Sequence, residues 1–151
     1  MGIYFNPTNE SFTQAKNSMI YVDKTELLEQ LNLRLSTENK CIAVSHARRF
    51  GKSHAAGMID AYYSLGCDSS NLFDNTKIAA NADYKKYMNK YNVIHLDISS
   101  FWDDFKDNPV EKIKEYIIDD FKKSFNDEID YSKKFSVILM SVCLHLLQFG
   151  E

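Results

Sequence analysis

The spacing of apolar residues divides this chain into candidate helices. Between 109 and 125, apolar residues recur every three or four positions, which predicts an amphipathic helix. Its apolar stripe consists of Val110, Ile113, Ile117, Phe121 and Phe125. Pro109 suits the first turn of a helix, where its missing N–H costs no hydrogen bond. The same kind of spacing predicts further helices from Thr25 onward and over 52–64, 83–91 and 132–147.

Two short apolar runs predict strands. Residues 41–44 and 93–98 have the length and composition of buried strands in a parallel sheet. A helix follows each run, and this alternation predicts an α/β fold with 41–44 as the central strand. Residues 93–98 are expected beside it or one position away. Residues 19–22 form a third short apolar run, which predicts a strand or an extended arm.

The segment between the first run and the next helix carries the candidate chemistry. It ends in Gly-Lys-Ser, the last fixed positions of the phosphate-binding P-loop, G-x-x-x-x-G-K-[ST]. In a P-loop, backbone N–H groups and the positive end of a helix face the phosphates. We predict that Gly51 admits close backbone approach, that Lys52 neutralises the β- and γ-phosphates, and that the Ser53 hydroxyl ligates Mg²⁺. His46 stands where the pattern has its first glycine.

Neighbouring residues are candidates for the same site. Arg48, Arg49 and Phe50 complete the predicted nucleotide-binding stretch. The two arginines could contact phosphates, or act as arginine fingers toward a neighbouring molecule, or belong to a solvated basic loop. Asp97 ends the second apolar run, where it could serve as a Mg²⁺ ligand or as a structural carboxylate near the site.

Composition excludes several classes of protein. The chain has 151 residues with 44% hydrophobic residues, five Gly and two Pro, which excludes a disordered or collagen-like chain. A formal net charge of −3 argues against direct nucleic-acid binding through bulk charge. The three cysteines lack metal-ligand spacing, and no signal peptide or membrane-spanning stretch is evident, so we expect a cytoplasmic protein.

Beyond the loop, separated blocks of sequence resemble the AAA-ATPase-like family of bacterial proteins, whose P-loop reads R-P-R-R-F-G-K-S. The similarity covers most of residues 1–148. The similar blocks are Asn17–Ser18, Tyr21–Thr25, Ala47–Ser53, Ala61–Ser64, Gly66–Ser69, Leu72–Phe73 and Tyr91–Asp97. Family members carry an N-terminal P-loop ATPase domain, and many add a C-terminal PD-(D/E)XK nuclease-like domain. The resemblance implies that ATP and Mg²⁺ are the cofactors.

Two departures from the family pattern shape the expectation. His46 and Ala47 replace the usual Arg-Pro, which removes one cation and one rigid residue from the loop. Residues 136–143 resemble the helix that precedes the Walker B strand, and the chain ends at Glu151 before that strand. We therefore expect a single partial domain over 1–151, an incomplete sheet, slow or absent hydrolysis, and self-association or a missing C-terminal domain as partner.

Parts of the sequence suggest three other functions. The chain could be an interaction module or degenerate fragment that no longer binds nucleotide, or a P-loop phosphotransferase, although no substrate pocket or catalytic acid is evident for the latter. A nuclease would need Asp and [Asp/Glu]-x-Lys on strands around a metal. Residues 104–106 and 120–122 match the short element, but solvated faces are the simpler expectation for both.

Overall fold

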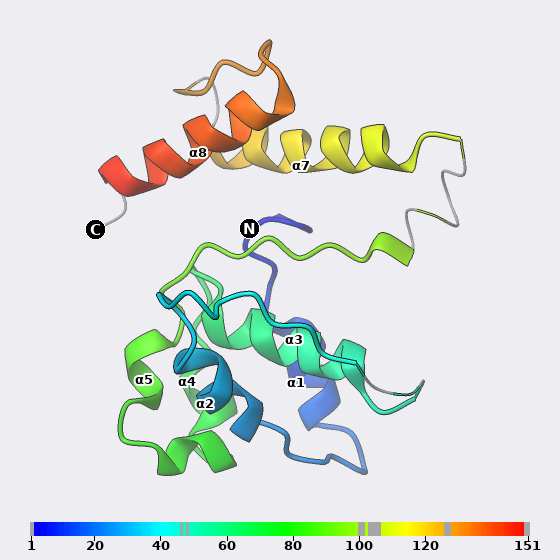
Figure 1. Cartoon of the computed structure of the whole chain (residues 1–151). Helices are drawn as coiled ribbons and strands as arrows, with labels where there is room; N and C mark the ends of the chain where they lie inside the picture. The colour runs from blue at the N-terminus through cyan, green and yellow to red at the C-terminus, as the bar shows by residue number, and fades with distance from the viewer. Residues whose placement is uncertain are drawn as a thin grey trace. The chain divides into compact units, whose positions relative to one another are not determined.

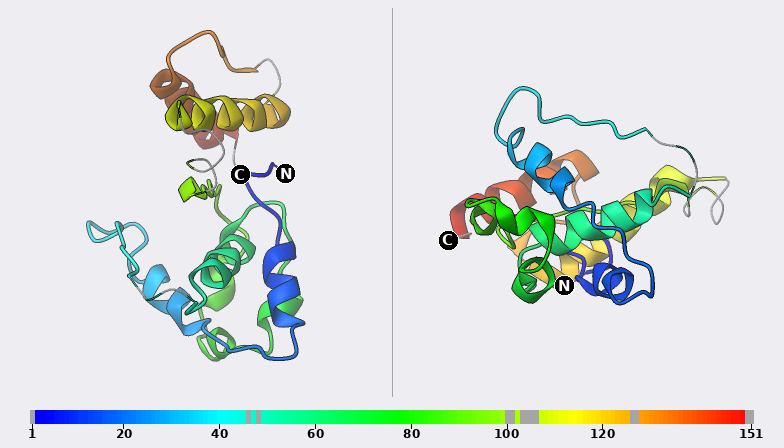
Figure 2. Two further views of the ribbon diagram at one scale, coloured as in Figure 1. Left: turned by 90° about the vertical axis from the view of Figure 1, so that its right-hand side faces the viewer. Right: turned by 90° about the horizontal axis from the view of Figure 1, so that it is seen from below.

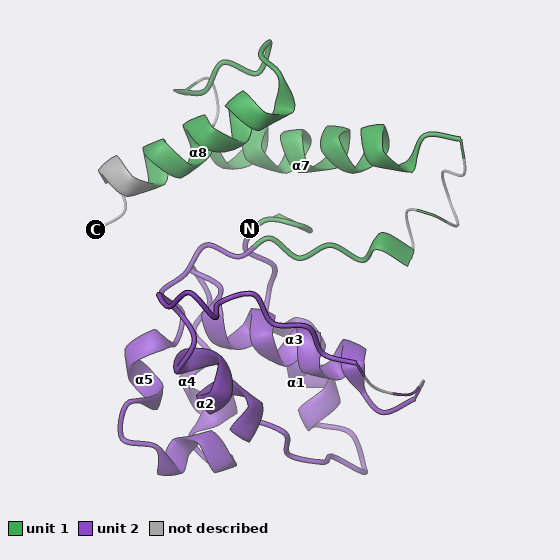
Figure 3. Ribbon diagram, in the orientation of Figure 1, with its two compact units in different colours: residues 1–5, 94–151 green, residues 6–93 purple. Residues whose placement is uncertain are grey.

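The computed structural model describes residues 2–45, 47, 49–99, 102, 107–125 and 128–149. The chain divides into two compact units, one of residues 6–93 and one of residues 1–5 with 94–151 (Figure 3). The elements (Figure 1) are α1 (Glu10–Lys16), α2 (Glu26–Asn32), α3 (Lys52–Tyr63), α4 (Ser70–Phe73), the 3₁₀ helix η1 (Lys77–Ala80), α5 (Tyr84–Tyr87), α7 (Pro109–Phe125) and α8 (Phe135–Phe149).

The unit of residues 6–93 packs short helices around α3. Helix α1 lies against α3 at Gly57, where an added Cβ would come within 2.7 Å of the Ser11 hydroxyl oxygen. The absence of a side chain at Gly57 therefore permits this close contact. Tyr62 of α3 is fully buried at the centre of the core, and its ring meets Phe73 edge-on at 5.2 Å between ring centroids. Further buried core residues are Phe12, Leu28, Met58, Ala61, Tyr63, Ile78, Tyr84 and Met88.

The other unit pairs α7 and α8 with the start of the chain. Phe5 packs edge-on against Phe121 at 5.3 Å between centroids, and Ile138 and Val142 of α8 complete the same core. Asp120 is only 2% exposed, and its carboxylate accepts a hydrogen bond of 2.7 Å from the Tyr4 amide. The expectation of a solvated face at 120–122 is therefore wrong for Asp120, which fastens the first residues of the chain to α7.

The predicted parallel α/β sheet is wrong. The described part of the chain is helical, and its β pairing is limited to two isolated bridges, Phe5 with Ile94 (antiparallel) and Ser64 with Tyr91 (parallel). Residues 41–44 and 93–98 form no strand ladder. By contrast, the helix predicted over 52–64 is present as α3, and those predicted over 109–125 and 132–147 are present as α7 and α8.

Exposure explains why the strand prediction failed. Ile42 and Val44 are 42% and 59% exposed, and Ile94 and Ile98 are 42% and 51% exposed, so neither run is buried. Residues 36–45 are exposed throughout and run apart from the helices of their unit (Figure 2, cyan). A strand needs a neighbour for its N–H and C=O groups. Residues 41–44 have none among the described residues, and apolar composition alone cannot supply one.

Candidate functional site

The Gly-Lys-Ser segment forms the junction between an irregular loop and α3. Gly51 is the residue before the helix and has φ +77°, in the left-handed region that favours glycine. Its carbonyl accepts the hydrogen bond of the Ala55 amide at 3.0 Å, which starts the helix. Arg49 also has positive φ, +67°, so the chain turns sharply just before Gly51. No described side chain caps the first turn of α3.

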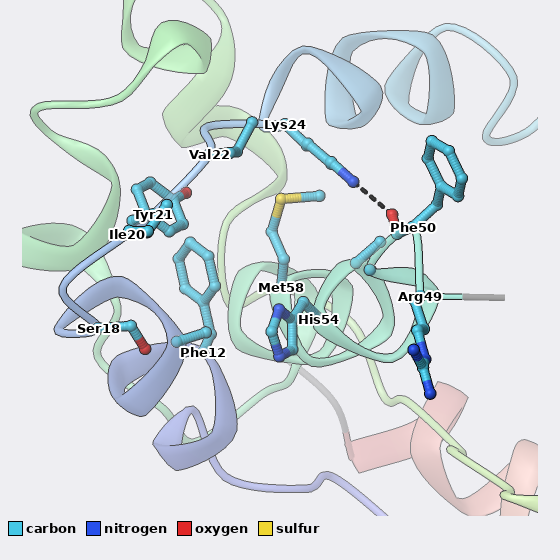
Figure 4. A pocket seen from close by; sticks show the side chains of 13 residues that line it. Phe12, Ser18, Ile20, Tyr21, Val22, Lys24, Arg49, Phe50, His54 and Met58 are labelled. Carbon is cyan, nitrogen blue, oxygen red and sulfur yellow. Dashed lines mark hydrogen bonds between the residues drawn. The ribbon is translucent and has the colours of Figure 1, made fainter.

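Two lysine side chains contact the backbone of this loop. The Lys52 ammonium donates to the Ala47 carbonyl at 3.1 Å and is exposed. The Lys24 ammonium donates to the Phe50 carbonyl at 2.5 Å (Figure 4). It also lies 3.1 Å from the position that a Cβ on Gly51 would occupy. The loop therefore receives positive charge from its own helix and from a segment 26 residues earlier.

A cavity of about 430 Å³ opens beside this loop. Arg49, Phe50 and Gly51 line one part of it, while Tyr21, Phe12 and Met58 supply an apolar wall (Figure 4). The other lining residues are Ala15, Ser18, Ile20, Val22, Lys24, His54 and Ala55. The cavity thus joins a basic backbone loop to an apolar recess within one unit.

The segment that carries Lys24 is held in place by its neighbours. Asp23 accepts hydrogen bonds from the Thr25 amide at 2.8 Å, from the Thr25 hydroxyl at 2.7 Å and from the Lys77 amide at 2.8 Å. The fully buried Thr25 hydroxyl accepts from the Ile78 amide at 3.1 Å. We call these four bonds the Asp23–Thr25 clamp. It joins the N-terminal segment to η1 and leaves Lys24 directed toward the loop.

Burial and hydrogen bonding shift two pKa values in this segment. Burial acts to raise the pKa of Asp23, but hydrogen bonds from Thr25 and Lys77 outweigh it and hold the pKa below its ordinary value of 3.8. Burial, together with the nearby Asp23 charge, raises the pKa of Tyr21 to about 12. The Tyr21 hydroxyl is buried and has no hydrogen-bond partner among the described residues.

The predicted site residues fall into three groups. Arg49, Phe50 and Gly51 line the cavity, whereas Lys52 and Ser53 are exposed on the first turn of α3 and do not line it. His46 and Arg48 lie outside the described residues. Asp97 belongs to the other unit, where its carboxylate accepts from the Ser99 hydroxyl at 2.5 Å and the Ser99 amide at 3.1 Å. The roles assigned to these residues stay predictions.

Sequence reasoning missed Lys24 and Tyr21. Both lie in the Tyr21–Thr25 block that resembles the family, but the block contains no phosphate-binding motif that would single out Lys24. The available signal was the spacing of Asp23 and Thr25, because side chains two residues apart on an extended segment point to the same side and Lys24 then points to the other. Within the described part of the chain, no group of three or more His, Cys, Asp or Glu side chains could hold a metal ion.

Helix α3 thus begins directly after a left-handed glycine, and Lys52 and Ser53 lie in its first turn. Residues 9–147 match the AAA-ATPase-like family, described as "Predicted AAA-ATPase". The chain belongs to this family. A search of curated proteins and a search of solved structures found no match. None of the described helices is long and apolar enough to cross a membrane.

Proposed function

We propose that this chain binds ATP with Mg²⁺ through the start of α3 and the adjoining cavity. The observation that carries the proposal is the junction at Gly51. A left-handed glycine there starts a twelve-residue helix that no described side chain caps. The Ser53 and His54 amides have no partner among the described residues, as is usual for the first turn of a helix. Such amides, together with the helix dipole, favour an anion.

The residues present fit a magnesium–triphosphate group. Lys52 would neutralise the terminal phosphates after leaving the Ala47 carbonyl, and its exposure permits that movement. Ser53 would hold Mg²⁺ through its hydroxyl, with phosphate and water oxygens completing the coordination. Bound Mg²⁺ would supply charge neutralisation across the phosphates. A Cβ at position 51 would lie 3.1 Å from the Lys24 ammonium, so glycine there allows that ammonium to approach the backbone at the start of α3.

The cavity supports a nucleotide as the ligand. A nucleotide has an anionic end and a planar, largely apolar base, and the cavity joins a basic loop to an apolar wall. Its volume of about 430 Å³ lies within the usual range for small-molecule sites. We place the base against Tyr21, Phe12 and Met58, with the phosphates at Gly51. The resemblance to the family implies an ATP-dependent activity, but the proposal is limited to binding of ATP with Mg²⁺, because hydrolysis is expected to be slow or absent.

Thermal unfolding of the purified chain with and without Mg-ATP tests the proposal. Ligand at about 100 times its Kd should stabilise the protein by roughly 2.7 kcal/mol. For a chain of this length, that raises Tm by roughly 5–10 °C. Lys52→Ala should abolish the shift, whereas Lys90→Ala, at an exposed position of the same unit, should retain it.

Two results would reject the proposed site. An unchanged Tm at millimolar Mg-ATP, in a chain that unfolds cooperatively, would replace the proposal with the alternative of an interaction module without nucleotide. A shift of the same size in wild type and Lys52→Ala would show that Mg-ATP binds elsewhere than at the start of α3.

A further inference from the structure

Beyond Lys52, a second lysine reaches the loop. We propose that Lys24 is a phosphate-binding residue of the same site. This inference rests on the proposed function and adds to it a residue that the Gly-Lys-Ser motif does not contain. On binding, the Lys24 ammonium would leave the Phe50 carbonyl, or share its donors with it, and contact a phosphate oxygen.

The Lys24 ammonium lies beside the start of α3. Lys24 donates to the Phe50 carbonyl, one residue before the glycine that starts α3. The same nitrogen is 3.1 Å from the Cβ position of Gly51, so it occupies space that any other residue at 51 would fill. Lys24 also lines the cavity together with Arg49 (Figure 4). A phosphate bound by the amides of the first turn of α3 would therefore lie close to this ammonium.

The contact of Lys24 with the loop leaves donors of its ammonium available for an anion. An ammonium has three N–H donors, and a single carbonyl uses one of them. Among the described residues, no carboxylate pairs with Lys24, although carboxylates pair with several other lysines of the chain. Lys24 is exposed, so it can change partner without crossing a packed interior. An anion in the cavity would provide the stronger, charge-assisted partner.

The backbone around Lys24 is anchored by hydrogen bonds. The Asp23–Thr25 clamp fixes the backbone on both sides of Lys24 through bonds to the amides of Lys77 and Ile78. Only the side chain of Lys24 then remains to be ordered when it binds phosphate. This arrangement lowers the entropic cost of recruiting a lysine from outside the loop.

A structural role is the competing explanation, because Lys24 could simply fasten the loop to the N-terminal segment. The chain offers a matched control in Lys16. Its ammonium also donates to a backbone carbonyl of the same unit, that of Leu72 at 2.5 Å, but it does not line the cavity. Lys24→Gln and Lys16→Gln remove the same kind of contact, and only the first removes charge from the site.

The test measures Kd for Mg-ATP and for Mg-tripolyphosphate by calorimetry, at low and high salt, in wild type, Lys24→Gln, Lys24→Arg and Lys16→Gln. Loss of one charge-assisted contact should weaken both ligands about 10- to 100-fold in Lys24→Gln. Lys24→Arg should largely restore binding, and Lys16→Gln should bind as wild type does. The salt dependence of affinity should fall in Lys24→Gln because one screened charge interaction is gone.

Two outcomes would overturn the inference while the proposed function stands. In the first, Lys24→Gln binds Mg-ATP as wild type does, although Lys52→Ala does not bind. In the second, Lys24→Gln binds more weakly with an unchanged salt dependence, which would assign Lys24 to fastening the loop. Failure of the wild type to bind either ligand would instead reject the proposed function, and this inference with it.

Discussion

Removing the carboxylate of Asp23 should destabilise the protein far more than removing its neighbour Glu26. Asp23→Ala deletes the acceptor for the Thr25 amide, the Thr25 hydroxyl and the Lys77 amide. Glu26→Ala deletes a carboxylate that also bonds Lys77, but through its ammonium at 2.8 Å, with both side chains more than half exposed. The two variants thus compare a clamp on backbone amides with a surface ion pair at the same residue.

The magnitudes follow from the environment of each carboxylate. A hydrogen bond to a charged group contributes about 1.5–3 kcal/mol, and such contributions are not additive. Because Asp23 is half-buried, we expect Asp23→Ala to lower the free energy of unfolding by about 2–4 kcal/mol. For a chain of this length, Tm should fall by roughly 5–15 °C. An exposed ion pair contributes about 0–1 kcal/mol, so Glu26→Ala should cost no more than that.

Guanidinium denaturation followed by circular dichroism of the helices measures both differences, and equal m-values would show that the same surface unfolds. pH supplies an independent check. Because the pKa of Asp23 is lowered in the folded protein, its stabilisation is complete above its ordinary pKa of 3.8 and is lost as pH falls through the lower folded value. The difference in free energy of unfolding between wild type and Asp23→Ala should therefore be constant near neutral pH and become smaller below about pH 4.

A difference of less than about 1 kcal/mol at pH 7 between the free energies of unfolding of Asp23→Ala and Glu26→Ala would contradict this role of Asp23, since only the Asp23 carboxylate holds backbone amides. A gap that widened in acid would contradict the direction of the pKa shift. Either result would also remove the anchored segment on which the role of Lys24 depends.

Three further predictions concern single groups. Asp120→Ala, which leaves the Tyr4 amide without its acceptor, should lower the free energy of unfolding by about 2–3 kcal/mol, whereas Asp119→Ala on the exposed side of α7 should cost under about 0.5 kcal/mol in the same denaturation assay. Tyr21→Phe should leave Tm unchanged or raise it, because its hydroxyl is buried without a partner; a fall of several degrees would reveal a partner outside the described residues. Gly51→Ala should lower the free energy of unfolding by about 1–2 kcal/mol through its positive φ, and Mg-ATP should no longer shift its Tm; a Tm shift in Gly51→Ala as large as that of the wild type would disprove the need for glycine there.

Helices with a sustained apolar period could be predicted from the sequence, whereas the structure of the short apolar runs could not. The stripe over 109–125 required a buried face, and Ile117, Phe121 and Phe125 of α7 supply it. The start of α3 at Lys52 also followed from the sequence, because the Gly-Lys-Ser pattern is expected directly before a helix and apolar residues for packing follow it. Residues 41–44 have the composition of a buried strand, yet a strand depends on a partner elsewhere in the chain. Local sequence carries no information on that partner, and here the run is exposed.

The same distinction applies within the candidate site. The Gly-Lys-Ser segment can be recognised in the sequence because the phosphate-binding P-loop has these residue types at consecutive positions. Lys24 has no such signature, since its relation to Gly51 is created by the fold. The physical origin of that relation is a period of two in residues 21–25: the Asp23 and Thr25 side chains bond the amides at the start of η1, and Tyr21 packs against Phe12. Lys24, between them, reaches the loop instead. The Asp23–Thr25 clamp therefore directs the side chain of Lys24 toward the loop. Exchanging Lys24 with Thr25 should disrupt both the clamp and the site, although the composition of the segment would be unchanged.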